Sequence, residues 1–130
     1  MSKDPKSILV VDDNEDIRNL LSLMLQSEGY VVYLASSGAE SLEIIKNNNV
    51  DLVLLDVMMP GLSGLEVLSA IRSNKDKKKS ALPVMMITAA STVSDIDAAI
   101  ETGATSYIIK PFRKENLIEK VSNLFKEEQS

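Results

Sequence analysis

The chain has 130 residues, of which 45% are hydrophobic and 25% are charged, as expected for one globular domain with a self-sufficient core. Its net charge of −5 disfavours direct nucleic-acid binding, and no apolar stretch reaches the length of about 18 residues that a membrane span requires. Because the chain contains no histidine and no cysteine, it cannot by itself form a Ser-His-Asp triad, a cysteine nucleophile or a zinc site with His or thiolate ligands.

The N-terminal residues MSKDPKS contain no apolar signal region, so we expect a cytoplasmic protein. Short apolar runs then predict five β-strands, at Ile8 to Val11, Val31 to Ala35, Leu52 to Leu55, Val84 to Ile87 and Tyr107 to Ile109. The runs alternate with helical patterns, which is typical of a parallel α/β sheet. The first, third and fourth runs are almost wholly apolar and should be central, whereas the other two mix polar and apolar residues and should lie nearer the edges.

Five apolar stripes predict five helices between and after these strands. The clearest stripe comprises Ile17, Leu20, Leu21, Met24 and Leu25, and Gly29 is the expected C-terminal cap. The other stripes lie around Leu42 and Ile45, Leu65 to Ile71, Val93 to Ile100, and Leu117 to Phe125. The lysine-rich run Ser73 to Leu82 is interpreted first as a solvated loop and second as a docking patch.

Four of the predicted strands end in polar side chains. Asp12 and Asp13 follow the first strand, Asp56 follows the third, and Thr88 and Lys110 follow the fourth and fifth. Ligands of open α/β sheets bind just beyond the carboxyl ends of the strands, so we expect these groups to converge in one pocket. Three carboxylates, a hydroxyl and an ammonium together favour phosphoryl chemistry.

Each of these residues also has a plainer interpretation. Asp12 or Asp13 could cap the helix that starts near Asn14, and Asp56 could cap the loop that follows it. Thr88 could be an ordinary strand threonine, and Lys110 a surface lysine at a strand end. The conjunction of all four strand ends is more specific than any single residue.

The acidic residues predict a metal site. Adjacent carboxylates repel each other, so Asp12 and Asp13 at the mouth of a buried strand indicate a cation between them and a third acid, Asp56. Oxygen ligands without imidazole or thiolate favour Mg²⁺ or a similar ion such as Mn²⁺.

The chain resembles the receiver domains of two-component response regulators, close in pattern to the single-domain chemotaxis regulators. The resemblance covers essentially the whole chain and rests on the segments ILVVDDNEDIR, DLVLLDVMMPGLSGLEVL, PVMMITA and GATSYIIKPF. It implies a flavodoxin-like, doubly wound five-stranded parallel sheet of order 2-1-3-4-5 with five helices. It further implies a single receiver domain over residues 1–130, with a core of about 7–127 and no output domain.

By this resemblance, Asp56 is the phosphoacceptor, and the donor is a phosphohistidine of a histidine kinase or a His-phosphotransfer protein. Asp13, Asp56 and the backbone carbonyl of Met58 would bind Mg²⁺ or Mn²⁺, with Asp12 reaching the ion through water. The expected protein is not an enzyme in the usual sense, although it would catalyse its own phosphorylation and dephosphorylation.

The resemblance also implies a switch. Thr88, Lys110 and the Ala89 N–H would hold the phosphoryl oxygens, and Tyr107 would follow Thr88 inward. The face formed by the fourth predicted helix, the fifth strand and the fifth helix would then change its affinity for a downstream effector or output domain. The protein would be a monomer or a phosphorylation-linked homodimer. The plainer interpretation of Tyr107 is a core or edge tyrosine.

Three alternatives are weighed against this assignment. A flavin or nucleotide binder of the same fold is disfavoured by the acidic first turn, Asp12 to Glu15, which lacks glycines or hydroxyls to cradle a phosphate. An aspartate-dependent phosphatase would need two acids spaced D-x-D after the first strand, whereas Asp12 and Asp13 are adjacent. A receiver-like module that has lost phosphorylation is disfavoured because every required residue is present.

The sequence predicts a long-lived acyl phosphate. Met58 and Ala90 stand at the two positions that tune phosphoryl loss in the family, and neither side chain can orient a water. We therefore expect Ala90→Gln, which introduces a polar amide, to accelerate dephosphorylation, as measured by the decay of the phosphorylated species after removal of the donor. An unchanged lifetime would contradict this explanation.

Overall fold

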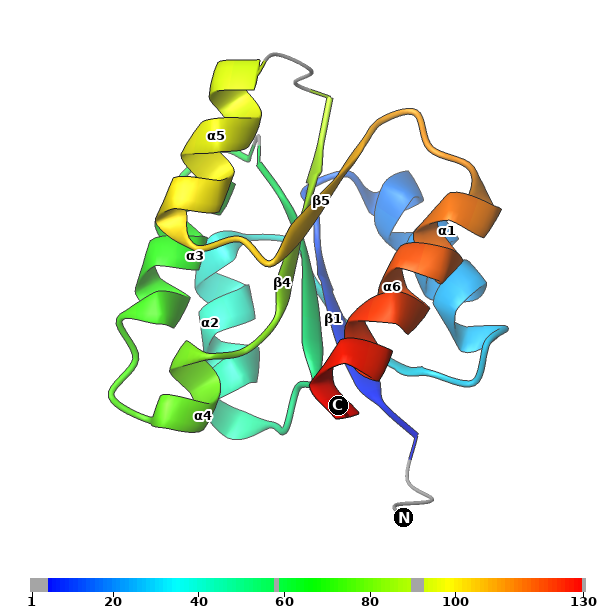
Figure 1. Ribbon diagram of the computed structural model, residues 1–130, viewed down its shortest axis with the longest axis horizontal. Helices are drawn as coiled ribbons and strands as arrows, with labels where there is room; N and C mark the ends of the chain where they lie inside the picture. Colours follow the sequence, from blue (N-terminus) through cyan, green and yellow to red (C-terminus); the bar gives the residue numbers. More distant parts are fainter. Residues whose placement is uncertain (1–4, 58, 90–92, 130) are drawn as a thin grey trace.

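The computed structural model describes residues 5–57, 59–89 and 93–129. Five strands form one parallel sheet in the order β2-β1-β3-β4-β5, which confirms the expected flavodoxin-like topology (Figure 1). The strands are β1 (Ser7–Val11), β2 (Val31–Ala35), β3 (Leu52–Asp56), β4 (Val84–Thr88) and β5 (Ser106–Ile109). The predicted strand boundaries are correct to within one residue, and the wholly apolar strands are the central ones.

The helices cover both faces of this sheet. They are α1 (Glu15–Gln26), α2 (Gly38–Asn47), α3 (Gly64–Arg72), α4 (Lys77–Ser80), α5 (Val93–Thr102) and α6 (Lys114–Gln129). Helices α1 and α6 lie on one face, and α2, α3 and α5 lie on the other (Figure 1). In the described ranges, no helix combines the length and the apolar character needed to cross a membrane.

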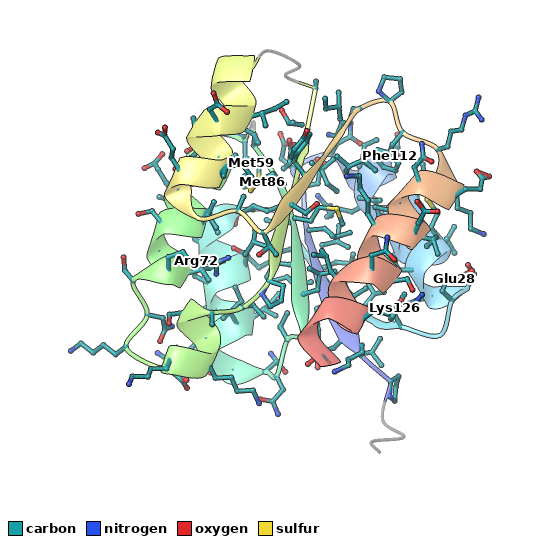
Figure 2. The ribbon with its side chains drawn as sticks, viewed as in Figure 1. Glu28, Met59, Arg72, Met86, Phe112 and Lys126 are labelled. Carbon is teal, nitrogen blue, oxygen red and sulfur yellow. The ribbon has the colours of Figure 1, made fainter. Side chains whose placement is uncertain are left out.

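Alternating residues of the central strands fill two separate cores. Leu9 and Val11 of β1 belong to the core under α2, α3 and α5, whereas Ile8 and Val10 belong to the core under α1 and α6. The labelled side chains in Figure 2 show the division, because Met59 and Met86 lie on the first side and Phe112 on the second. Each fully buried aliphatic side chain contributes about 1.5–3 kcal/mol, so both faces of the sheet stabilise the fold. This two-sided burial explains the nearly continuous apolar runs.

Local contacts define both ends of α1. Asn14, and not an aspartate, is the N-cap, because its side chain accepts a hydrogen bond from the Ile17 N–H at 3.1 Å. The regular helix ends at Gln26, and Gly29 closes it as predicted. With φ +91°, Gly29 donates its N–H to the Gln26 carbonyl at 3.0 Å, and the Tyr30 N–H donates to the Leu25 carbonyl at 3.3 Å, which is the Schellman pattern of a C-terminal glycine cap.

The lysine-rich run is partly helical, so its interpretation as a loop was incomplete. Asp76 caps a single helical turn, α4, by accepting hydrogen bonds from the Lys78 and Lys79 N–H groups at 2.9 and 3.4 Å. The Lys79 ammonium donates to the Lys46 carbonyl at 2.9 Å, which ties this turn to the end of α2. The described residues therefore form six helices instead of the expected five.

Arg72 connects three segments at the end of the sheet where the strands begin. Its guanidinium donates to the carbonyls of Gly103 at 2.9 Å, Leu82 at 2.6 Å and Ser80 at 3.0 Å, and to the Thr105 hydroxyl at 3.4 Å. Burial lowers the pKa of the Arg72 guanidinium from its ordinary value, but a group this basic remains protonated. The Arg72 guanidinium thus joins the end of α3 to the segments that precede β4 and β5.

Replacing Arg72 tests this connection. Arg72→Met keeps the aliphatic stem but leaves the carbonyls without their donor, so we expect a loss of about 2 kcal/mol in the free energy of unfolding. Urea denaturation measures the loss. Arg72→Lys retains the charge but not the planar fork and should lose less. A methionine variant as stable as the wild type would show that the network contributes nothing.

Candidate functional site

Three carboxylates meet where β1 and β3 end. Asp12 follows β1 and is 1% exposed, Asp56 is the last residue of β3 and is 6% exposed, and Asp13 is exposed. A carboxylate oxygen from each of the three lies within 4.8 Å of the others. The parallel pairing of β1 with β3, in which Val11 faces Leu55, brings these residues together although more than forty positions separate them in the chain. The structure therefore assembles the acidic cluster that the strand ends suggested.

The backbone N–H, the backbone carbonyl and both carboxylate oxygens of Asp12 all form hydrogen bonds. Its N–H donates to the Ala35 carbonyl at 3.2 Å, and its carbonyl accepts from the Arg18 guanidinium at 2.7 Å. One carboxylate oxygen accepts from the Asn14 N–H at 2.9 Å, and the other accepts from the Lys110 ammonium at 3.3 Å. Asp12 is thus a fixed, buried anion, consistent with the rule that buried polar groups are paired.

Lys110 supplies a cation to the cluster. Its Nζ lies 3.3 Å from Asp12 Oδ2 and 3.8 Å from Asp56 Oδ2, and its side chain is 25% exposed. The Lys110 N–H donates to the Thr88 carbonyl at 2.7 Å, and the peptide bond from Lys110 to Pro111 is cis. One ammonium against three carboxylates leaves an excess of negative charge, and like charges at this spacing repel by a few kcal/mol per pair. The chemistry of the donor set therefore suits a divalent cation.

Thr88 ends β4 beside this cluster. It is 5% exposed, and because Asp56 pairs with Ile87, Thr88 stands one residue beyond the position opposite Asp56. Ala89 follows it and is exposed. Two predicted site residues, Met58 and Ala90, lie outside the described residues.

Tyr107 lies away from the carboxylates. It is half-buried on β5, opposite Met86, and packs against the core beneath α2, α3 and α5. The Lys120 ammonium lies 5.4 Å from the centre of its ring, within the range of a cation–π contact. Tyr107 is therefore not a direct contact of the acidic cluster, and any role in a response has to act through β4 and β5.

Two residues that shape the site were not predicted as parts of it. Arg18, on α1, binds the Asp12 carbonyl, and no local pattern identifies a side chain that pairs with a backbone oxygen. Gly64 begins α3, and a β-carbon there would meet the Asp56 carbonyl oxygen and would lie 2.7 Å from the Val57 Cα. A capping box formed by Ser63 and Glu66 starts the helix at this point, and this motif is visible in the sequence.

An apolar groove of about 430 Å³ lies beside the cluster. Its lining comes from α1, the end of β4 and the segment after β5, and consists of Ile17, Leu20, Met24, Ala89, Lys110, Pro111 and Phe112. Leu20 is 47% exposed, so its apolar side chain is open to solvent at this groove. Lys110 is the one charged residue in the lining, so the groove leads from an apolar surface to the carboxylates.

Comparison with known proteins gives consistent results. The family model of the response regulator receiver domain matches residues 8–122. The chain is 43% identical over 122 residues to the response regulator MprA of Mycobacterium sp. strain KMS, covering 94% of this chain and 51% of that protein. It is 42% identical over 114 residues to the uncharacterised transcriptional regulatory protein YkoG of Bacillus subtilis, covering 88% of this chain and 48% of that protein. The chain thus spans about half the length of these curated relatives.

Solved structures show the same likeness. The chemotaxis protein CheY4 of Vibrio cholerae superimposes with a TM-score of 0.86 at 30% identity, covering 92% of this chain and 98% of the other. The response regulator TrrA of Thermotoga maritima, in complex with Mg(2+)-BeF, superimposes with a TM-score of 0.80 at 43% identity and the same coverage of both chains.

Gly64 offers a test of how closely α3 packs on the acidic strand end. We expect Gly64→Ala to lower the free energy of unfolding by about 1–3 kcal/mol, because the added methyl group meets backbone atoms that cannot turn aside. Chemical denaturation measures the effect, and the backbone amide NMR shifts of Asp56 and Val57 report the displacement.

Gly61→Ala is the matched control, since Gly61 has φ +75° but no atom lies within 4 Å of an added β-carbon. It carries backbone strain without the clash and should leave the Asp56 and Val57 resonances in place. Equal shifts in both variants would show that the contact with Gly64 does not position this strand end.

Proposed function

The chain belongs to the response regulator receiver domain family, and from this premise we propose that it is a phosphorylation switch in which Asp56 accepts a phosphoryl group. The observation that carries the proposal is the gathering of Asp12, Asp13 and Asp56 within 4.8 Å beside the Lys110 ammonium. Family membership establishes the phospho-accepting class, and the roles of individual residues below are our proposal.

Asp13, Asp56 and the backbone carbonyl of Met58 are the proposed ligands of Mg²⁺, with Asp12 acting through water; Mn²⁺ is the alternative ion. When bound, such an ion offsets the carboxylate charge and the charge on the transferring phosphoryl oxygens. The fit is supported by a donor set made only of oxygen atoms and by its unbalanced negative charge. The Mg(2+)-BeF complex of the related Thermotoga maritima protein lends further support.

In the proposed transfer, a carboxylate oxygen of Asp56 attacks the phosphorus of a phosphohistidine on a partner kinase or His-phosphotransfer protein. The new O–P bond forms an acyl phosphate, the P–N bond breaks, and the imidazole nitrogen keeps the electron pair and takes up a proton. Lys110, already within 3.8 Å of Asp56, would donate to a phosphoryl oxygen, together with the Thr88 hydroxyl and the Ala89 N–H. Catalysis here is positioning and charge stabilisation, so the protein would promote its own modification without being an enzyme in the usual sense.

The partner has to reach a buried carboxylate, and the apolar groove beside Lys110 suits that approach. A protein donor that seats an apolar side chain between Leu20 and Phe112 would bring its imidazole toward Asp56 while excluding water. The exposure of Leu20 supports this location, because burying it would favour the complex.

The acyl phosphate would act as a signal through charge. A phosphoryl group adds about −1.5 to −2 charge at Asp56, which gives Thr88 and Lys110 new charge-assisted bonds and draws the end of β4 inward. Tyr107, paired through β5 with β4, would follow, and the face formed by α5, β5 and α6 would change its affinity for an effector or output domain. Such a change could also favour a homodimer over the monomer.

The domain boundaries and the cellular location are predictions from the sequence. We propose one receiver domain over residues 1–130, with a core of about 7–127, acting in the cytoplasm. A flavin or nucleotide binder of the same fold is disfavoured by the acidic pocket, since three carboxylates would repel an unbridged phosphate.

A mass measurement tests the acceptor. With Mg²⁺ and acetyl phosphate, the wild type should gain one phosphoryl group, and Asp56→Asn should gain none because an amide is not nucleophilic under these conditions. Asp97→Asn, a change of the same charge at an exposed position on α5, is the control and should be modified like the wild type. An unmodified wild type, or equal modification of Asp56→Asn, would overturn the assignment.

A further inference from the structure

Arg18 makes a short contact with the backbone of the acidic turn. It lies in the first turn and a half of α1 and is half-buried, and its Nη1 donates to the Asp12 carbonyl at 2.7 Å. This distance is at the short end of the range for charge-assisted hydrogen bonds, which are about twice as strong as neutral ones. A long side chain is therefore fixed to a single carbonyl next to the proposed metal site.

The contact matters more for Asp13 than for Asp12. The Asp12 carboxylate is already held by the Asn14 N–H and by Lys110. In the described part of the chain, by contrast, no hydrogen bond or ion pair holds the Asp13 side chain. The Asp12 carbonyl and the Asp13 N–H belong to one planar peptide unit, so fixing the carbonyl oxygen also fixes the plane from which the Asp13 Cα extends and leaves fewer rotations by which the Asp13 side chain can move.

We propose that Arg18 is a positioning residue that orients Asp13 for Mg²⁺ binding by holding the peptide unit between Asp12 and Asp13. This inference rests on the proposed function, because it concerns the same metal. Arg18 does not touch the ion or the phosphoryl group; it limits rotation of the peptide that carries a metal ligand. Groups that orient metal ligands from outside the coordination sphere typically account for a factor of about 10–100 in metal affinity.

Electrostatic repulsion alone predicts the opposite effect of removing Arg18 on Mg²⁺ affinity. Removing a positive charge next to three carboxylates should strengthen the binding of a divalent cation. If Arg18 positions Asp13, its removal should weaken binding despite this gain. The direction of the change therefore separates positioning from simple charge.

The first experiment measures Mg²⁺ affinity by NMR titration of backbone amides on the intact chain. Arg18→Met should raise the Mg²⁺ dissociation constant on the order of tenfold. Arg113→Met removes the same charge from an exposed position after β5, and its affinity should be unchanged or slightly tighter. Arg18→Lys keeps a donor and the charge and should recover part of the loss.

The second experiment asks whether Arg18 acts through Asp13. In an Asp13→Asn background, adding Arg18→Met should weaken Mg²⁺ binding by much less than tenfold, because the ligand that Arg18 positions is already impaired. Melting temperatures in EDTA show how far each variant destabilises the metal-free fold, and Arg18→Lys carries the test if Arg18→Met does not fold.

The outcomes separate the inference from the proposed function. If the wild type does not bind Mg²⁺, both are overturned. If the wild type binds but Arg18→Met binds equally or more tightly, only the positioning role is overturned. A full tenfold loss in the Asp13→Asn background would likewise overturn it, since Arg18 would then act by another route.

Discussion

The repulsion among Asp12, Asp13 and Asp56 is the constraint on which the rest of the site depends. Folding places three carboxylates within 4.8 Å of one another, and two of them are almost completely buried. Such an arrangement opposes folding unless positive charge and hydrogen-bond donors offset it. Lys110 supplies one charge, and the Arg18 guanidinium and the Asn14 N–H supply donors. The remaining negative charge suits the site to a divalent cation, which in the proposed function would also offset the charge of a phosphoryl group.

The sheet provides the rigidity that this arrangement needs. Its central strands are buried on both faces, and each face has its own core, so the strand ends cannot separate without exposing apolar surface. Gly64 brings the start of α3 onto the backbone of Asp56, and Arg72 holds the other end of α3 against the segments before β4 and β5. Helix α3 thus spans from the proposed acceptor to the far end of the sheet.

The proposed phosphorylation site and the proposed effector-binding face lie in different parts of the fold. The carboxylates and Lys110 lie at the carboxyl edge of the sheet, whereas Tyr107 packs along β5 at the side of the molecule. Thr88 connects the two, because it ends β4 next to Asp56 and pairs with β5 at Ile109. In the proposed switch, a charge change at Asp56 would reach the α5, β5 and α6 face through this strand end.

The sequence by itself determined the elements, the central and edge strands, and which polar residues stand at the strand ends, because burial on two faces leaves a periodic apolar pattern that can be read locally. It did not reveal the sixth helix, the Asn14 cap, or the contacts of Arg18 and Arg72. The caps at Asn14 and Asp76 are local side-chain contacts that the apolar pattern does not mark, whereas the contacts of Arg18 and Arg72 depend on the folded chain, because their acceptors are mostly backbone carbonyls, which every residue carries. Arg72 and Gly103 are 31 positions apart, and only the packing of α3 against α5 brings that guanidinium and that carbonyl together.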